Sequence, residues 1–308
     1  MIEAVNLTKR YGKKTAVDNI SFTVEPGTVT GFLGPNGAGK STTMRMIMGL
    51  DKPTSGKVTV NGRPYRDLSA PLCEVGALLD AKGLHGSRSA RSHLRQLAAS
   101  NGIPAKRVDE VLDITGLTSV AKKRVKGFSL GMGQRLGIAA ALLGDPGVLL
   151  FDEPVNGLDP EGVKWVRETC RRLAGEGRTV FISSHLMSEM AQTADHLLVI
   201  GRGRILTAGP VNDVIASATT DRVRVASPQA TQLAELMASR NLAARPVAPN
   251  VLETTATSAA TIGELAAQGG IVLHELTTIR ASLEEAYMTL TSDSVEYRTD
   301  PAHQGQAA

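Results

Sequence analysis

One segment constrains the fold more than any other, because an apolar strand, a glycine-rich loop and a helix follow one another in it. Residues 29–33, VTGFL, have the composition of a buried strand, GPNGAGKST occupies residues 34–42, and the helical stretch that follows ends at Gly49. The loop has the spacing G-x-x-x-x-G-K-S, in which glycines let backbone amides turn toward an anion. An ordinary glycine turn is the alternative, and the flanking strand and helix argue against it. The segment predicts a nucleotide site.

The residues of this loop are expected to have different roles in nucleotide binding. Lys40 is expected to reach the β- and γ-phosphates, and the Ser41 hydroxyl is expected to ligate Mg²⁺. The residues predicted to cradle the phosphates are Gly34, Pro35, Asn36, Gly37, Ala38, Gly39, Lys40, Ser41 and Thr42. A nucleotide with Mg²⁺ is therefore the expected ligand.

Acidic residues end a second apolar strand, GVLLFD, at Asp152 and Glu153. Beside a phosphate loop, the first carboxylate is placed to hold Mg²⁺ through its water shell and the second to polarise an attacking water. We assign Asp152 to the metal and Glu153 to general base catalysis, although in isolation a solvated acid pair would be the simpler interpretation. His185 follows the strand RTVFISS and could contact the γ-phosphate, whereas a lone histidine is more often structural.

The order of elements predicts an α/β chain with two domains. Parallel strands that are covered on both faces have continuous runs of apolar residues. Residues 147–152 and 178–184 have this composition. We place the first domain at residues 1–217, with antiparallel strands at its start and a helical insertion at about 81–141. A composition change near residue 218 indicates a small α/β domain over 218–292, with strands at DRVRVAS, VLETTA and GIVLHEL. The polar tail 293–308 is expected to be disordered.

Helix starts in the smaller domain carry a local signal. Ser282 with Glu285, and Thr261 with Glu264, both have the spacing of a capping box. Asp159, followed by Pro160 and Glu161, predicts another helix start in the larger domain.

Composition limits the compartment and the partners. The 34 basic and 30 acidic residues nearly balance, so charge gives no argument for nucleic acid. The apolar stretches are shorter than the ~20 residues of a membrane span, and the start has no secretory signal. Two cysteines outside any metal-ligand pattern suit a reducing environment. We expect a cytoplasmic protein with no nucleic-acid partner.

Taken together, residues 1 to about 215 resemble the nucleotide-binding subunit of an ATP-binding cassette transporter. The matching parts are Tyr11 at the adenine-stacking position, GPNGAGKST, the helical insertion, FSLGMGQR as the signature motif, VLLFDEP, NGLD with Asp159, and SSH with His185. The resemblance implies a phosphate-loop core with an antiparallel β subdomain, ATP with Mg²⁺ as ligands, and ATP hydrolysis. It also raises stacking of Tyr11 on adenine above simple packing.

The resemblance implies that two cassettes share each nucleotide. In such proteins the signature loop covers the ATP held by a partner, and here Ser129, Gly131 and the following helix start would contact its γ-phosphate, with Asp159 nearby. ATP would hold a dimer together, and hydrolysis would release it. Two positions depart from the family pattern. Leu130 replaces a signature glycine, and Asp80 stands where a glutamine usually ligates Mg²⁺ and senses the membrane partner.

The same resemblance predicts a separate permease. Its cytoplasmic helix would dock between Asp80 and GLHGSRSARSHL, and would hold the protein at the inner face of the membrane. VGALLD, SLGMGQR and RASLEEAYMTLT are similar to the ATPases of bacterial drug and antibiotic exporters, including daunorubicin- and bacitracin-type systems. Two alternatives are a soluble cassette ATPase acting on ribosomes or DNA, and a regulator that binds nucleotide without hydrolysing it.

Overall fold

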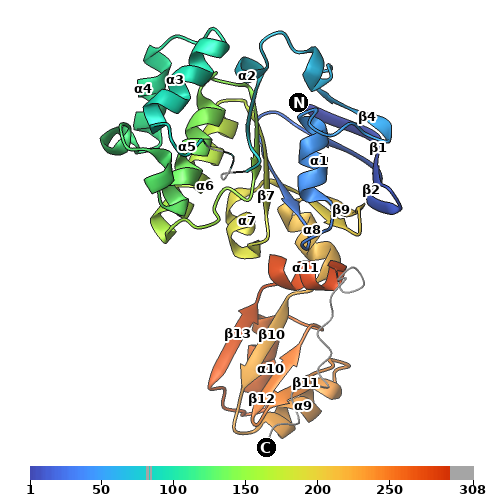
Figure 1. Cartoon of the computed structure of the whole chain (residues 1–308). Helices are drawn as coiled ribbons and strands as arrows, with labels where there is room; N and C mark the ends of the chain where they lie inside the picture. Colours follow the sequence, from blue (N-terminus) through green and yellow to red (C-terminus); the bar gives the residue numbers. More distant parts are fainter. Residues whose placement is uncertain (81–82, 84, 292–308) are drawn as a thin grey trace, which may run out of the picture. The chain divides into compact units, whose positions relative to one another are not determined.

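The computed structural model describes residues 1–80, 83 and 85–291. These residues form two compact units, Met1–Val211 and Asn212–Leu290, which we treat separately (Figure 1). The boundary predicted after residue 217 falls near the end of helix α8 (Val211–Ala218). The predicted tail, 293–308, lies outside the described residues. No helix in the described part of the chain is long and apolar enough to span a bilayer.

A six-stranded sheet forms the centre of the first unit. Its order is β5 (Val75–Leu78), β6 (Val148–Asp152), β7 (Thr179–Ser184), β3 (Val29–Leu33), β8 (His196–Gly201) and β9 (Arg204–Pro210). The first five strands run parallel and β9 pairs antiparallel with β8. Every residue of β3 and β7 is buried, which explains their continuous apolar or small side chains. The predicted apolar strands are therefore confirmed as the interior of a parallel sheet.

Helices cover both faces of this sheet. Figure 1 shows α1 (Lys40–Ile47) on one side, and α5 (Leu130–Leu142), α6 (Pro160–Gly175) and α7 (Met187–Thr193) on the other. The helix α6 starts as predicted, because the Asp159 carboxylate accepts a hydrogen bond from the Gly162 amide at 3.0 Å.

A separate antiparallel sheet completes the core of this unit. It has the order β2 (Lys14–Val24), β1 (Ile2–Tyr11), β4 (Ser55–Val60). Phe22 of this sheet stacks on Phe181 of β7, with ring centroids 5.9 Å apart, and Phe32 lies 5.1 Å from Phe181. Met44 and Ile47 of α1 are buried in the same cluster. One apolar core thus fixes α1, and with it the phosphate loop, against both sheets.

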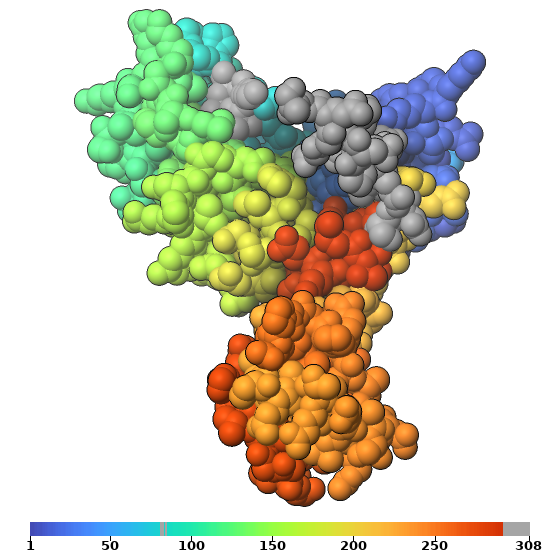
Figure 2. Space-filling model, turned by 90° about the horizontal axis from the view of Figure 1, so that it is seen from below, coloured from blue at the N-terminus to red at the C-terminus, as the bar shows by residue number. Residues whose placement is uncertain are grey.

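The helical insertion contains α3 (Ala90–Ser100), α4 (Lys106–Ile114) and α5, with short helices at Pro71–Glu74, Thr118–Val120 and Val125–Gly127 around them. Figures 1 and 2 show the insertion, coloured cyan to green, at one end of this unit and the N-terminal strands, in blue, at the other. The Ser89 hydroxyl caps α3 by accepting from the Ser92 amide. Buried Leu94 and Leu112 show that α3 and α4 share an apolar face.

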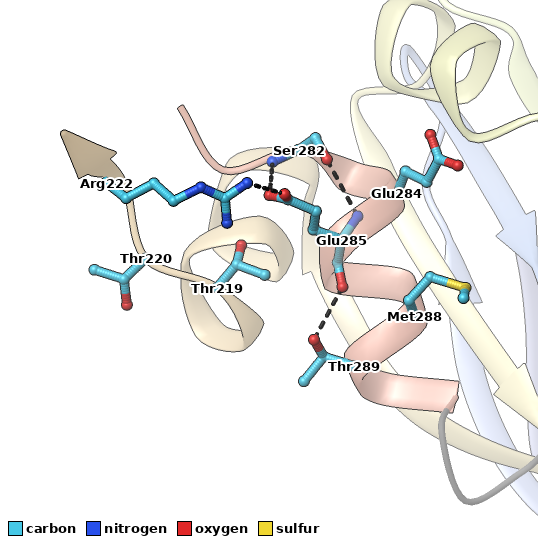
Figure 3. Close-up of a pocket in the computed structure, with 8 residues that line it drawn as sticks. All are labelled: Thr219, Thr220, Arg222, Ser282, Glu284, Glu285, Met288 and Thr289. Atoms are coloured by element: carbon cyan, nitrogen blue, oxygen red, sulfur yellow. Dashed lines mark hydrogen bonds and ion pairs between the residues drawn. The ribbon is translucent and has the colours of Figure 1, made fainter. Parts of the chain in front are cut away.

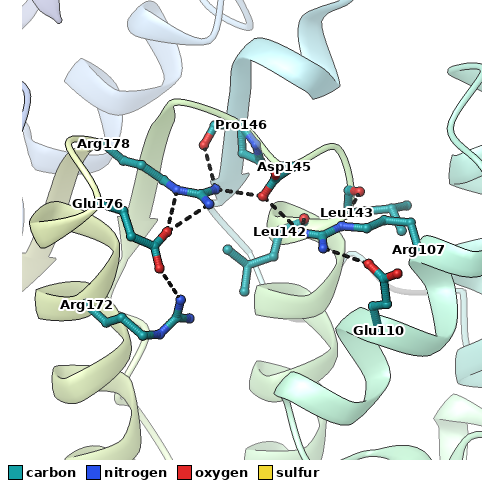
Figure 4. Close-up of polar contacts among 9 residues, drawn as sticks. All are labelled: Arg107, Glu110, Leu142, Leu143, Asp145, Pro146, Arg172, Glu176 and Arg178. Carbon is teal, nitrogen blue, oxygen red and sulfur yellow. Dashed lines mark hydrogen bonds and ion pairs between the residues drawn. The ribbon is translucent and has the colours of Figure 1, made fainter.

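One arginine ties α4 to the rest of the unit (Figure 4). The Arg107 guanidinium donates to the terminal carbonyls of α5, at Leu142 (3.1 Å) and Leu143 (3.3 Å). It also pairs with Glu110 and with Asp145, and Asp145 accepts a second hydrogen bond from Arg178 at 2.9 Å. The Arg107 side chain is 22 % exposed. It therefore satisfies carbonyls that have no partner inside their own helix.

The second unit is a four-stranded antiparallel sheet with helices on one face. The strands β10 (Arg222–Ala226), β11 (Arg245–Ala248), β12 (Val251–Thr254) and β13 (Glu275–Ile279) have the spatial order β11-β12-β10-β13. Helices α9 (Ala230–Ala238) and α10 (Ala259–Gln268) follow β10 and β12 and pack on its buried side. This is the βαββαβ arrangement of a ferredoxin-like fold.

Three sequence predictions in this unit need correction. GIVLHEL was assigned to a strand, but β13 starts at Glu275, because pairing with Arg222–Ala226 of β10 sets its register. The edge strand β11 was not predicted, since all its residues are exposed and Pro246 interrupts the strand pattern. Ser258, rather than Thr261, caps α10, and its hydroxyl accepts from the Thr261 amide at 3.2 Å.

The capping box at Ser282 and Glu285 is confirmed at the start of α11 (Leu283–Thr291), with hydrogen bonds of 3.1 and 3.4 Å in the two directions. Arg222 of β10 reaches the same glutamate and holds α11 against the end of the sheet (Figure 3). A cavity of about 700 Å³ opens between these elements. Its lining is mostly hydroxyl and charged side chains, so it is a polar depression.

Replacing Arg107 with methionine tests the contribution of the α4 junction. We expect the free energy of unfolding of the first unit to fall by about 1–2 kcal/mol, because the Leu143 carbonyl loses its Arg107 donor and the Leu142 carbonyl is left with the Asp145 amide. Urea and thermal unfolding of the purified protein measure the change. Lys106→Met is the matched control, since Lys106 is 87 % exposed and its ion pair within the described residues is with Glu110 at 3.6 Å. Equal effects of the two substitutions would show that the carbonyl contacts add nothing.

Candidate nucleotide site

The predicted site residues gather where the parallel strands end. Gly34 follows β3, Asp152 ends β6, and His185 follows β7, which are neighbouring strands in the sheet. Asp80 comes two residues after β5, at the next position along the same edge. Parallel strands place their carboxyl ends together, so residues from four distant parts of the chain lie along one edge of the sheet, although Asp80 does not line the cavity described below.

The phosphate loop is built on two close backbone approaches. A Cβ atom at Gly34 would lie 2.5 Å from the Ile200 carbonyl oxygen of β8, and one at Gly39 would lie 2.6 Å from that of Ala16 in β2. Gly37 and Gly39 also have φ of 82° and 112°, which side chains with a Cβ rarely adopt. Space therefore requires glycine at position 34, the dihedral angle requires it at position 37, and both require it at position 39.

Lys40 lies almost buried inside this loop. Its ammonium donates to the Gly34 carbonyl at 2.6 Å and to the Pro35 carbonyl at 3.4 Å, and 7 % of the residue is exposed. Burial lowers the pKa of the Lys40 ammonium, while the nearby charges of Glu153 and Asp152 raise it. The loop thus holds a cation in place beside two carboxylates.

The side chain that orders the acidic pair is Ser183 of β7. Its hydroxyl donates to Asp152 Oδ1 and accepts from the Glu153 amide at 3.0 Å. Glu153 has φ of 51°, a value that residues with a Cβ seldom adopt, so the backbone turns sharply directly after Asp152. Ser183 was not predicted from the sequence; the available signal was a serine at the end of the apolar run of this strand.

Glu153 is held on two sides. Its Oε2 lies 2.7 Å from His185 Nδ1, and its backbone carbonyl accepts from the Gln134 side-chain amide at 3.1 Å. Gln134 lies on α5, five residues after Ser129, and is 5 % exposed. The predicted base and the predicted histidine therefore form one pair, and Gln134, which we also missed, links this pair to the signature helix.

A cavity of about 200 Å³ joins the phosphate loop to the acidic pair. Its lining contains most of the predicted loop residues together with both carboxylates: Pro35, Asn36, Gly37, Gly39, Lys40, Ser41, Thr42, Asp152 and Glu153. Ser41 and Asp152 bring a hydroxyl and a carboxylate to the same space. These are hard oxygen donors of the kind that bind Mg²⁺ together with phosphate oxygens and water, so the residues present fit that ion.

Tyr11, the predicted adenine contact, lies at the end of β1 outside this lining. Its hydroxyl donates to Asp51 Oδ2 at 2.8 Å, and Arg45 of α1 donates to the same carboxylate at 2.7 Å. The Lys9 ammonium lies 4.9 Å from the centre of the Tyr11 ring. The ring is 48 % exposed. It is therefore oriented by its hydroxyl and keeps much of its surface free for contact.

The signature loop also lies outside the lining of the cavity. Ser129 is the N-cap of α5, and its hydroxyl accepts from the Met132 amide at 3.2 Å. Leu130 has a Cβ and would disfavour a positive φ, but it is the first residue of the helix and does not have one. Ser129 and Leu130 are exposed and Gly131 is half-buried. This helix start is therefore accessible but separate from the chain's own phosphate loop.

The loop before Asp159 packs against the signature helix. A Cβ atom at Gly157 would lie 2.2 Å from Leu130 Cδ2, and one at Gly131 would lie 3.2 Å from the Gly157 carbonyl oxygen. Gly157 has φ of 75°. The leucine that departs from the family pattern thus rests directly on the NGLD segment.

The comparisons with known proteins agree with this geometry. The family described as "ABC transporter" matches residues 17–156, and a domain of unknown function, DUF8746, matches residues 221–284. The bacitracin transport ATP-binding protein BcrA of Bacillus licheniformis is 45 % identical over 213 residues, covering 68 % of this chain and 70 % of the relative. The uncharacterized ABC transporter ATP-binding protein YhcH of Bacillus subtilis is 35 % identical and covers 96 % of this chain and 97 % of the relative. A daunorubicin resistance ATP-binding protein, DrrA3 of Streptomyces coeruleorubidus, is 32 % identical over 301 residues, 92 % of this chain and 94 % of the relative.

Solved structures show the same fold. The structure of an ATP binding subunit of an ABC transporter has a TM-score of 0.65 at 26 % identity and covers 70 % of this chain and 92 % of its own. The dimeric structure of MJ0796, a bacterial ABC transporter cassette, has a TM-score of 0.63 at 24 % identity, covering 68 % of this chain and 98 % of its own. These findings confirm the predicted resemblance and fold class. The chain belongs to the ATP-binding cassette family, among the ATP-binding proteins of ABC transporters.

Proposed function

We propose that this protein is the ATP-hydrolysing subunit that drives export of an antibiotic- or drug-like compound through a separate membrane permease. The observation that carries the proposal is the placement of Glu153 by Ser183 and His185 beside the Lys40 cavity. The names of the bacitracin and daunorubicin relatives support the class of cargo. A regulator that only binds nucleotide would not need a carboxylate ordered in this way.

The residues of the cavity have separable tasks in hydrolysis. Lys40 and the amides of the phosphate loop would bind the β- and γ-phosphates of ATP, and Lys40 would stabilise charge on them during phosphoryl transfer. Ser41 and Asp152 would hold Mg²⁺, which supplies further neutralisation of phosphate charge. Glu153 would accept a proton from the attacking water, and His185 would keep its carboxylate oriented.

The second half of the nucleotide site would come from another cassette. Ser129 and Gly131 do not line their own cavity, and the amide end of α5 on which they lie is accessible. Helix N-termini favour anions, so this end suits the γ-phosphate of an ATP bound by the partner. We propose a head-to-tail dimer, with Asp159 in the loop that accompanies this helix. Tyr11 would stack on adenine, because its ring is exposed and its hydroxyl is fixed.

The permease would dock beside Asp80. This residue is exposed after the edge strand β5 and precedes the helical insertion, so it connects the sheet edge of the catalytic residues to the insertion. The Asp80 carboxylate would contribute an oxygen to the coordination shell of Mg²⁺. The same side chain would also contact the docked permease. In this arrangement the protein is cytoplasmic and peripheral to the membrane.

In the proposed dimer, Leu130 would act as a spacer between the signature helix and the loop that precedes Asp159. Its side chain fills the place that a Cβ at Gly157 would occupy. Because both segments would face the partner cassette, this contact would keep the two halves of the dimer surface in fixed relation.

Glu153→Gln tests the proposed function. We expect ATP hydrolysis to fall by roughly 10²–10⁴-fold, the usual contribution of a general base, while ATP binding persists and an ATP-bound dimer accumulates. Phosphate release and light scattering of the eluted protein measure both effects. Glu168→Gln, which changes an exposed acid of α6, should leave both unchanged. Undiminished hydrolysis in the Glu153 variant would refute the assigned base.

Ser129→Arg tests the shared site. The long, positively charged arginine side chain should prevent the partner cassette from closing on this surface. We therefore expect loss of hydrolysis and of ATP-dependent dimerisation. The monomer should still bind nucleotide, which fluorescence titration measures. Ser258→Arg removes the equivalent cap of α10 and is expected to preserve hydrolysis. Loss of nucleotide binding by the Ser129 variant would contradict a site divided between two chains.

The Leu130 contact is tested with a glycine pair. Gly157→Ala should lower the free energy of unfolding by about 1–3 kcal/mol more than Gly177→Ala, because both positions have positive φ but space is open around Gly177. Adding Leu130→Ala should remove most of that difference. Thermal unfolding of the variants gives the comparison, and an unchanged difference would exclude steric contact with Leu130.

A further inference from the structure

The helical insertion has a larger net positive charge than the whole chain. Residues 81–144 contain eleven lysines and arginines and three acidic residues, whereas the formal charge of the whole protein is +4. The rest of the chain is therefore net negative. A charge separation of this size within one protein creates a directional field and favours one orientation near an anionic partner.

The three acidic residues of the insertion lie on α4, and two of them form ion pairs with basic residues of the insertion. Asp109 pairs with Arg91, and Glu110 pairs with Lys106 and Arg107. A further cation, Arg135, lies 4.7 Å from the ring centre of Trp165. These contacts leave a distinct group of basic residues outside the ion pairs of the described chain.

That group forms a basic patch, which we define as Arg88, Lys122, Lys123, Arg124 and Lys126. Two backbone segments bring these residues together: the Val125 amide donates to the Arg88 carbonyl, and the Lys126 amide donates to the Gly86 carbonyl, both at 2.9 Å. An antiparallel bridge between Ser89 and Arg124 joins the same segments.

The cations of the patch are available to a partner. Lys122, Lys123, Arg124 and Lys126 are exposed, and Arg88 is half-buried with a hydrogen bond to the Gln96 side-chain oxygen. Within the described residues, none of the five makes an ion pair. Ordered backbone thus holds five positive charges on one surface without internal neutralisation.

We propose that the basic patch binds the anionic lipid headgroups of the membrane surface directly. Clusters of four to eight lysines and arginines attract anionic leaflets, with about 1 kcal/mol per residue near the surface. The proposal rests on the membrane association contained in the proposed function, and it adds a contact made by this subunit itself. It would orient the insertion, at one end of its unit in Figure 2, toward the bilayer.

The side chains favour a lipid surface over nucleic acid or an acidic protein groove. Three of the five are lysines, which act as strongly hydrated point charges and do not depend on planar paired geometry. Phe128 is the one aromatic residue in the sequence from 81 to 144, so stacking platforms for bases are lacking there. Diffuse, exposed charge matches the diffuse charge of headgroups.

Vesicle sedimentation of the purified full-length protein tests the inference without a permease. We expect binding to vesicles of three parts phosphatidylcholine to one part phosphatidylglycerol, and at least about tenfold weaker binding to phosphatidylcholine alone. Raising the salt from about 0.1 M to about 1 M should abolish the difference, because the screening length falls from about 10 Å to about 3 Å.

A triple variant should bind the acidic vesicles about tenfold more weakly, or weaker still. It combines Lys122→Ser, Lys123→Ser and Lys126→Ser. The matched control combines Lys13→Ser, Lys14→Ser and Lys57→Ser. These substitutions remove the same charge from exposed sites on the N-terminal strands and their turn. This control should bind the vesicles as tightly as the unchanged protein. Equal losses in the two triple variants, equal binding to both vesicle types, or tighter binding of the patch to duplex DNA would each overturn the inference. Hydrolysis assays on the Glu153 variant are independent of these results, so failure here would leave the proposed function standing.

Discussion

The buried ammonium of Lys40 is the interaction on which the rest of the first unit depends. Removing a cation from water is costly unless it is hydrogen-bonded and compensated by opposite charge. Two loop carbonyls and the nearby Asp152 and Glu153 provide that compensation before any nucleotide arrives. The loop thus holds the cation beside the cavity that Asp152 and Glu153 also line.

That placement requires three strands to meet at one loop. Gly34 and Gly39 allow the loop to lie against the backbones of β8 and β2, where a Cβ would collide with carbonyl oxygens. The phenylalanine cluster and α1 then join the antiparallel sheet to the parallel one. The catalytic loop is therefore also the junction between the two sheets, so changes that separate the sheets would displace Lys40.

The sequence allowed prediction of those parts of the site that local pattern determines. The phosphate loop, the strand that ends at Asp152 and the Asp159 cap follow from short-range composition and spacing, and all three are found where expected. Ser183 and Gln134 act on Glu153 from other elements, across 30 and 19 positions of sequence. Their roles depend on strand order and helix packing, which a single sequence does not encode locally. The register of β13 and the exposed edge strand β11 escaped prediction for the same reason.

Leu130 shows how the local backbone can accommodate a departure from a family pattern. A leucine in place of a flexible glycine would be expected to disturb a loop that needs unusual dihedral angles. Here the helix begins at this residue, and its side chain instead occupies the open face of Gly157. Gln134 of the same helix binds the carbonyl of Glu153. The signature helix thus contacts both the NGLD loop and the backbone of Glu153 in its own chain. In the proposed dimer, a partner nucleotide at the start of α5 would contact the same helix that holds the Glu153 backbone, so this helix would link the two nucleotide sites.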